Sequence, residues 1–239
     1  MDFGFTPGDT VVVTGAASGI GEAIAVMAAR AGLRVAAWDL ADAVHGTAEA
    51  IRRAGGTAVA AVADVGDPAA VERALAAAGQ VRYLVNNAGP ASSREMPFDT
   101  ALAATVGTVQ LVTSAWLRSE PPEGSAVVNI ASVAGNFMGT DSAWYSAGKA
   151  AIAGYTRHLA TRQAPRIRAN AIAPGFVATP RMAAFAASEL GQTVVQRNPM
   201  RRAGRAEDVA AAVLFLLSPL SGYVNGVLLP VDGGWTVTQ

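Results

Sequence analysis

The sequence predicts an α/β protein built around a doubly wound parallel sheet. Short apolar runs rich in β-branched residues alternate along the chain with longer, alanine-rich helical stretches. Hydrophobic residues make up 51% of the 239 residues and charged residues only 15%, which is typical of strands covered by helices on both faces. The length suits a single domain over residues 1–239, and the Gly- and Pro-rich connections are typical of loops rather than domain linkers.

The alternation predicts about seven strands and six main helices. The strands are expected at residues 10–14, 34–39, 57–62, 83–86, 126–130, 168–172 and 227–231. The helices are expected at residues 22–31, 44–54, 68–78, 100–119, 144–162 and 206–218. In such a sheet, ligands bind at the carboxyl ends of the strands.

A glycine-rich turn separates the first strand from the first helix. Residues 15–21 read Gly-Ala-Ala-Ser-Gly-Ile-Gly. Glycines at such a turn let the backbone approach a pyrophosphate, and the free N–H groups of the helix N-terminus favour an anion. The spacing G-x-x-x-G-x-G differs from the common G-x-G-x-x-G, but the strand–turn–helix context predicts a dinucleotide site.

The second strand ends in a carboxylate, Asp39, about twenty residues after the glycine turn. A carboxylate at this place can accept hydrogen bonds from the adenosine ribose hydroxyls. It would also repel a 2′-phosphate, by about 4 kcal/mol at 4 Å and an effective dielectric of about 20, before screening. The sequence therefore favours NAD(H) over NADP(H).

Tyr145 and Lys149 lie four residues apart and so share one face of the predicted helix. A nearby ammonium lowers the pKa of a phenol by about 1 to 3 units from its usual value of about 10, which suits proton transfer near neutral pH. Ser132 lies thirteen residues upstream and offers a hydroxyl that can orient a carbonyl. These groups fit the interconversion of an alcohol and a carbonyl, provided that a cofactor carries the hydride.

Together, these motifs resemble the short-chain dehydrogenase/reductase family. The matching residues are Thr14-Gly15-x-x-x-Gly19-Ile20-Gly21, Asn86-Asn87-Ala88-Gly89, Ser132, Tyr145-x-x-x-Lys149 and Pro174-Gly175, in order along nearly the whole chain. The resemblance implies a Rossmann-like fold with Tyr145 as general acid/base. It also implies that Lys149 binds the nicotinamide ribose and that Ser132 holds the substrate oxygen.

The resemblance also assigns the cofactor contacts. Asp64 and Val65 match the pair that contacts adenine, while Thr179 matches a residue that bonds the carboxamide, although it could equally cap the next helix. The full expected set is Gly15, Ser18, Gly19, Ile20, Gly21, Asp39, Asp64, Val65, Asn86, Asn87, Ala88, Gly89, Tyr145, Lys149, Pro174, Gly175, Val177 and Thr179.

One position departs from the family pattern. Many members carry a catalytic asparagine three residues before a glycine in the helix ahead of the serine strand, and the aligned residue here is Ala104. Three explanations stay open: a relay through Thr105, Thr108 or backbone-held water, slower proton exchange with solvent, or a lost activity.

The sequence identifies a substrate class but no substrate. The expected lining residues are mostly apolar, which favours a hydrophobic or cyclic alcohol or ketone; they are Ala134, Asn136, Phe137, Trp144 and Phe176, with a lid at about residues 180–200. Two alternatives are a 3-oxoacyl-carrier-protein-type reductase, whose acidic carrier would meet the arginines of segment 199–205, and a non-catalytic NAD(H)-binding regulatory protein. The direction of the reaction is left open.

Composition excludes several other functions. The net charge is zero with no basic run, so nucleic-acid binding is not expected. The chain has no cysteine and only two isolated histidines, His45 and His158, so no metal site is expected. No basic, apolar leader opens the chain and no apolar run spans a bilayer, which predicts a cytoplasmic protein without a membrane partner. A homotetramer built on the helices beginning near Thr100 and Trp144 is implied by the family alone.

Overall fold

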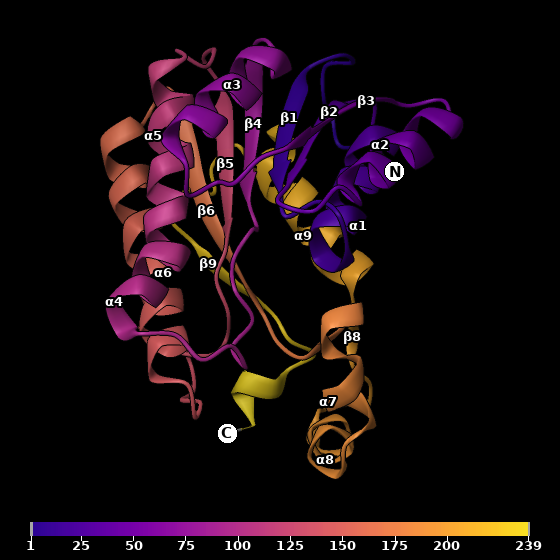
Figure 1. The fold of residues 1–239 in the computed structure, drawn as a ribbon, viewed down its shortest axis with the longest axis vertical. Coiled ribbons are helices and arrows are strands. Elements are labelled where there is room, and N and C mark those ends of the chain that lie inside the picture. The colour runs from indigo at the N-terminus through magenta and orange to yellow at the C-terminus, as the bar shows by residue number, and fades with distance from the viewer. Residues whose placement is uncertain (1, 239) are drawn as a thin grey trace.

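The computed structural model describes residues 2–238 and has a seven-stranded parallel sheet at its centre (Figure 1). The strand order is β3-β2-β1-β4-β5-β6-β9. Each pair of neighbouring strands in this sheet is parallel. The strands are β1 (Thr10–Thr14), β2 (Arg34–Asp39), β3 (Thr57–Val62), β4 (Val81–Asn86), β5 (Ser125–Ile130), β6 (Ile167–Pro174) and β9 (Leu228–Val231). The order reverses between β1 and β4, where a doubly wound sheet forms its ligand crevice.

Helices cover both faces of this sheet. One face carries α1 (Gly19–Arg30), α2 (Val44–Arg53) and α9 (Ala206–Leu217). The other carries α3 (Pro68–Ala78), α5 (Thr108–Arg118) and α6 (Ala143–Gln163). A short helix α4 (Phe98–Leu102) and a π-helical turn (Ala103–Gly107) run continuously into α5. The two-layer cover explains why the strands read as unbroken apolar runs.

Alternate residues of each central strand enter different halves of the core. Val11 and Val13 pack with α1 and α9, whereas Val12 packs with the helices of the opposite face. All three are fully buried, and burying such side chains stabilises a fold by about 1.5–3 kcal/mol each. The β-branched residues of β1 therefore pack against the helices on both faces of the sheet.

The predicted fold class is confirmed, and most element boundaries agree closely. The predicted strands 10–14, 34–39 and 57–62 and helix 68–78 coincide with β1, β2, β3 and α3, and the other elements differ by a few residues at their ends. The sequence reasoning did not predict the small parallel pair of β7 (Val177–Ala178) with β8 (Gly204–Arg205). It also did not resolve the predicted lid into a 3₁₀ turn (Pro180–Met182), α7 (Ala183–Ala187) and α8 (Glu189–Arg197).

The lid projects from the carboxyl-terminal end of the sheet, near the C-terminus of the chain (Figure 1). It begins and ends at the β7–β8 pair, so residues 179–203 form one excursion from the main fold. Near the end of this segment lies the buried residue Asn198, whose side-chain amide donates to the carbonyl of Asp232 at 2.7 Å.

One helical stretch, Phe98–Arg118, is long and apolar enough by composition to cross a membrane. In the fold its first half packs on α6, and its second half, α5, packs on α3 and β4. Its apolar composition is therefore accounted for by its place in the layer that covers the sheet.

Candidate active site

The glycine turn is a tight, backbone-dominated structure. Gly15 and Gly19 have positive φ angles of 67° and 60°, a conformation that glycine adopts without steric cost. A Cβ atom at Gly21 would lie 2.0 Å from the carbonyl oxygen of Gly15. Helix α1 therefore begins directly against the turn.

The end of β4 clamps this turn. The side-chain amide of Asn87 donates to the carbonyl oxygens of Thr14 and Gly15 at 3.0 and 3.1 Å. The Thr14 hydroxyl accepts from the backbone N–H groups of Asn87 and Ala88, both at 3.0 Å. The two predicted cofactor segments thus meet at the sheet's reversal point.

Asn86 has a different role from its neighbours. Its side chain is buried and donates to Thr113 at 2.9 Å and to the side chain of Asn129 at 2.8 Å. Its side chain therefore connects β4 to α5 and β5 inside the core, and a contact of Asn86 with the cofactor stays a prediction.

Of the two acidic residues expected at the adenosine end, Asp39 contacts the glycine turn. The two carboxylate oxygens of Asp39 accept from the backbone N–H groups of Ala17 at 2.9 Å and Ala41 at 3.0 Å. Asp64 lies exposed after β3, where its carboxylate accepts from the N–H of Gly66 at 2.8 Å. Thr179 approaches from the other side, with its side chain 3.3 Å from the position of a Cβ at Gly19. Its hydroxyl makes no capping bond to the turn that follows.

Ser132, Tyr145 and Lys149 come from β5 and α6, and the structure brings them together. Ser132 is buried just after β5, and its hydroxyl oxygen accepts from the N–H of Ala134 at 3.1 Å. The Lys149 ammonium donates to the carbonyl of Ile130 at 2.8 Å and lies 5.7 Å from the centre of the Tyr145 ring. The end of β5 thus holds the lysine through the carbonyl of Ile130 and carries the serine that bonds to the phenol.

Burial dominates the electrostatics of this group. It raises the pKa of Tyr145, while the Ser132 hydroxyl and the positive charge of Arg181 act to lower it. Burial, together with the charge of Arg181, lowers the pKa of Lys149 to about 8. The expected lowering of the phenol's pKa by Lys149 is wrong for this structure, because burial raises that pKa and Lys149 is not among the groups that act on it. The cation that acts to lower it is Arg181, which the sequence reasoning did not assign to this group.

The loop after Ser132 is held firmly against α6. The side-chain amide of Asn136 donates to the carbonyls of Ser132 at 2.9 Å and Lys149 at 3.2 Å. A Cβ at Gly135, which has a φ of 76°, would lie 2.0 Å from the carbonyl oxygen of Ser146. Asn136 therefore positions the reacting residues as well as lying near the expected substrate.

Aromatic and sulfur-bearing side chains gather around the reacting end. Trp144 is buried with its ring against that of Tyr145, and Phe176 packs edge-on against Phe185 of the lid. Phe137 is about half exposed. The sequence reasoning missed Trp235, whose indole N–H lies 3.1 Å from the sulfur of Met138. This contact brings the C-terminal turn to the same loop, and the sequence carries no local signal for it.

Ala104 lies in the π-helical turn. The hydroxyl of Thr105 donates to the carbonyl of Ala101 at 2.8 Å, and that of Thr108 donates to the carbonyl of Thr105 at 2.8 Å. Thr105 also lies against Gly148, the residue before Lys149. A relay through either hydroxyl stays a prediction, and it would require these carbonyl bonds to be exchanged.

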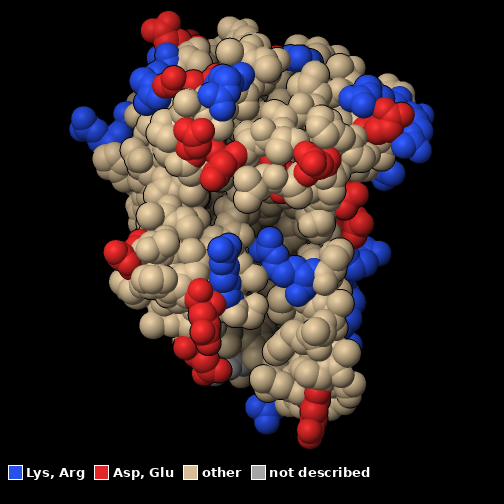
Figure 2. Space-filling model, viewed as in Figure 1, with Lys and Arg blue, Asp and Glu red and all other residues tan. Residues whose placement is uncertain are grey.

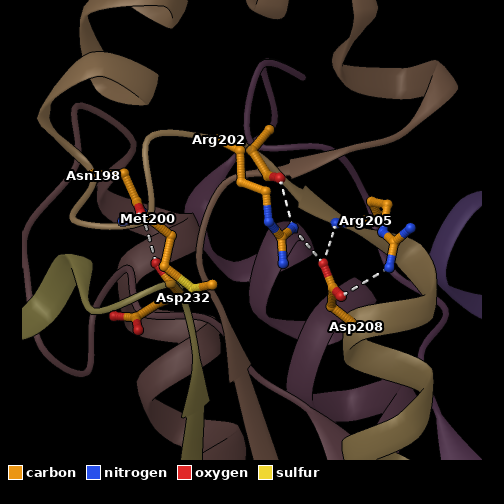
Figure 3. Close-up of polar contacts among 7 residues, drawn as sticks. Asn198, Met200, Arg202, Arg205, Asp208 and Asp232 are labelled. Atoms are coloured by element: carbon orange, nitrogen blue, oxygen red, sulfur yellow. Dashed lines mark hydrogen bonds and ion pairs between the residues drawn. The ribbon is translucent and has the colours of Figure 1, made fainter.

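A small cluster of ion pairs joins the base of the lid to α9 (Figure 3). The carboxylate of Asp208, at the start of α9, accepts from the guanidinium of Arg202 at 2.6 Å and from the backbone N–H of Arg205 at 2.8 Å. The guanidinium of Arg205 lies 3.6 Å from the same carboxylate. Within residues 2–238, no group of His, Asp and Glu side chains is arranged to hold a metal ion.

Comparisons with known proteins identify the family of this chain. A family model described as enoyl-(acyl carrier protein) reductase matches residues 15–236. The chain is 39% identical over 238 residues to the cis-4-hydroxycyclohexanecarboxylate dehydrogenase of Sinomonas cyclohexanicum, which covers 94% of this chain and 95% of that one.

Solved structures share the fold over almost the full length. A putative NAD(P)-dependent gluconate 5-dehydrogenase from Beutenbergia cavernae, with NADP bound at low occupancy, is 37% identical with a TM-score of 0.89, and the match covers 99% of this chain and 100% of that chain. A putative D-mannonate oxidoreductase from Haemophilus influenza with bound NAD is 25% identical with a TM-score of 0.88, over 97% and 96% of the two chains. The chain belongs to the short-chain dehydrogenase/reductase family and is an oxidoreductase acting on hydroxyl or carbonyl groups.

Proposed function

We propose that this protein interconverts a secondary alcohol and a ketone on a hydrophobic or cyclic small molecule, using NAD(H). The observation that carries the proposal is the convergence of Ser132, Tyr145 and Lys149 at the end of β5. A nicotinamide cofactor would supply or accept the hydride. The positive-φ glycines and the start of α1 fit its pyrophosphate.

The side chains of this site divide the remaining work. In the direction of reduction, the phenolic O–H of Tyr145 donates a proton to the carbonyl oxygen, and Ser132 donates a hydrogen bond to the same oxygen. Lys149, held by the carbonyl of Ile130, stabilises the phenolate that is left and can bind the nicotinamide ribose. In the direction of oxidation, the phenolate removes the alcohol proton.

Asp39 supports NAD(H) over NADP(H). Its carboxylate is fixed beside the glycine turn by two backbone N–H groups, so it cannot swing away from a 2′-phosphate without breaking both bonds. Related structures hold either NADP or NAD, and the fixed carboxylate is the feature of this chain that favours the second.

A cyclic substrate is supported by the apolar surroundings of the reacting group and by the name of the cyclohexane-acting relative. The carrier-protein reductase is the second candidate, because the matching family model bears that description. The arginines that would bind an acidic carrier already have partners in this chain. Arg202 and Arg205 pair with Asp208, and Arg201 donates to the carbonyl of Gln196. A free small molecule is therefore the better fit.

We also propose that the protein acts in the cytoplasm as a homotetramer, with α5 and α6 forming subunit contacts. The family resemblance supports this assembly, and sedimentation equilibrium tests it. A species with four times the mass of one chain is expected, and a monomer at micromolar concentration contradicts the assembly without touching the chemistry.

Replacing the phenol tests the chemistry directly. With a panel of cyclic ketones and alcohols, Tyr145→Phe is expected to lower kcat by about 10² to 10⁴-fold, the usual contribution of a general acid/base. NADH affinity, measured by fluorescence titration, is expected to stay within about twofold. If wild type and variant both bind NADH and neither turns over any panel member, the non-catalytic NAD(H)-binding reading is supported instead.

A further inference from the structure

Arg181 reaches from the lid to the opposite side of the crevice. It lies in the 3₁₀ turn Pro180–Met182, two residues after Thr179, and its side chain is exposed. One nitrogen of its guanidinium donates to the carbonyl of Gly89 at 3.2 Å, in the loop that follows β4. The guanidinium therefore stands between the lid and the end of the sheet, where the crevice opens. Blue side chains, the colour of lysine and arginine, border the hollow in the middle of this face (Figure 2).

The charge of Arg181 has no carboxylate partner among residues 2–238. The ion pairs of this part of the chain do not include it, whereas Arg202 and Arg205 at the base of the lid share Asp208. A guanidinium has five N–H donors, and the bond to Gly89 is the hydrogen bond that the structure gives to this side chain. Most of its capacity to bind an anion is therefore unused.

This cation acts on the reacting end of the site. Its charge influences both Tyr145 and Lys149, so the guanidinium lies within electrostatic reach of the phenol and the ammonium. Phe176 and Phe185 flank Arg181 along the chain and pack edge-on against each other, so this segment also offers an apolar surface.

We propose that Arg181 binds the carboxylate of the substrate, which assigns to this enzyme an alicyclic hydroxy acid or keto acid. The ring would lie against the apolar side chains, with the hydroxyl or ketone at Tyr145 and Ser132 and the carboxylate on the guanidinium. A planar guanidinium matches a carboxylate through two parallel hydrogen bonds. The assignment rests on the proposed alcohol–ketone chemistry and names its substrate class.

The competing anion is the diphosphate of the dinucleotide. That group is expected at the glycine turn, where Gly15 and Gly19 have positive φ angles and α1 begins. Arg181 bonds to Gly89, which is itself in the expected cofactor set, but its charge acts on Tyr145 and Lys149 at the reacting end of the site. Its position therefore favours the substrate's anion, and the two sources give different results in the measurements below.

Binding of a non-reacting ligand tests the site without requiring turnover. NADH-saturated protein is titrated calorimetrically with cyclohexanecarboxylate and with cyclohexanecarboxamide. Wild type is expected to bind the carboxylate at least tenfold more tightly, and Arg181→Leu is expected to lose this preference, while Arg181→Lys keeps part of it. Arg197→Leu, which removes another exposed lid arginine, is expected to behave as wild type. A wild type without the preference, or an Arg181→Leu variant that retains it, overturns the assignment.

Kinetics and cofactor titration separate the possible causes. With 4-oxocyclohexanecarboxylate, Arg181→Leu is expected to lower kcat/KM tenfold to a hundredfold, mostly through KM; with the matching carboxamide the change is expected to be within about threefold. The dissociation constant of NADH is expected to change by less than about twofold, and a rise as large as the loss of carboxylate binding assigns Arg181 to the dinucleotide and overturns the proposal. Carboxylate preference without any turnover would retain the anion site and reject the proposed chemistry.

Discussion

The glycine-turn side of the crevice and the lid side are held by different kinds of contact. On the first side, Thr14, Asn87 and Asp39 make hydrogen bonds to backbone groups of β1, β4 and the turn, mostly in buried or half-buried positions. On the second side, residues 179–203 are joined to the main fold by a two-residue strand pair, the ion cluster at Asp208, the bond from Asn198 to Asp232 and the bond from Arg181 to Gly89. Apart from the buried Asn198, the side chains that make these contacts are exposed or partly exposed.

This difference matches the two tasks of the crevice. A cofactor is the same in every turnover, so a rigid, buried frame can bind it at little conformational cost. A lid must open to admit a substrate, and segments with few buried contacts open at lower free energy than a core does. The side chains that distinguish substrates, such as Arg181, accordingly lie on the less firmly held side.

The largest effect is expected from Gly21→Ala, which attacks the rigid side. The added Cβ would lie 2.0 Å from the carbonyl oxygen of Gly15 and 2.6 Å from the amide nitrogen of Asn87. We expect the free energy of unfolding, measured by urea unfolding, to fall by about 3 kcal/mol. We also expect NADH binding, measured by fluorescence titration, to be lost.

Gly46→Ala provides the matched control for that substitution. Gly46 is exposed in α2 with no atom within 4 Å of its Cβ position, so alanine is expected to stabilise the helix by about 0.5–1 kcal/mol. A Gly21→Ala variant as stable as wild type would show that the turn is not the rigid frame described above.

The next largest effect is expected on the pH dependence of the free energy of unfolding, through the buried ammonium of Lys149. The pKa of Lys149 is about 8 in the folded protein, against 10.5 ordinarily, so between these values the unfolded chain binds more protons than the folded one. The free energy of unfolding is therefore expected to rise from pH 8 to pH 10, by about 2 kcal/mol relative to Lys149→Met. Above about pH 10, tyrosines whose pKa is raised by burial act in the opposite direction.

Lys149 is the only lysine in the chain, which gives this prediction a direct measurement. Protein labelled with ¹⁵N-lysine shows a single side-chain ammonium signal, and its titration is expected to have a midpoint near pH 8. A midpoint above pH 10 would contradict both the burial effect and the pH dependence of stability.

The sequence predicted the rigid side well because its signals are local. The apolar run of β1, the glycines that follow it and the carboxylate ending β2 lie within thirty residues and specify the turn that the structure contains. Ser132, Tyr145 and Lys149 also converge as predicted, because a strand end and the start of the next helix are adjacent in a parallel sheet. The sequence does not reveal which of the two neighbouring amides, Asn86 or Asn87, has its side chain in the core.

The lid side was predicted only in outline because its contacts are distant in sequence. Strands β7 and β8 are two residues long and lie about twenty-five residues apart, too short for any periodicity. The contact of Arg181 with Gly89 and that of Trp235 with Met138 each join segments more than ninety residues apart. Such contacts depend on tertiary packing rather than on local propensity.

A smaller effect is expected for cofactor choice on the rigid side. Asp39→Asn removes the negative charge but keeps an oxygen that can accept one of the two backbone N–H groups. NADPH binding is expected to tighten about tenfold, or 1.4 kcal/mol, because repulsion of the 2′-phosphate is relieved. Fluorescence titration with NADPH and NADH measures the change, and an unchanged ratio of the two dissociation constants would contradict the role given to Asp39.

The smallest effect is expected at the base of the lid. Asp208→Asn weakens the pairs with Arg202 and Arg205 and the bond from the backbone N–H of Arg205, so unfolding is expected to cost about 1 kcal/mol less. Hydrogen exchange of residues 180–200 is expected to accelerate several-fold while β1 stays protected.

Asp67→Asn is the matched control, since Asp67 caps α3 with the same chemistry but lies outside the lid. It is expected to cost similar stability without accelerating exchange in residues 180–200. Equal acceleration in both variants would mean that lid opening follows global unfolding, and the contrast between a firmly held cofactor side and a lightly held lid would then have no dynamic counterpart.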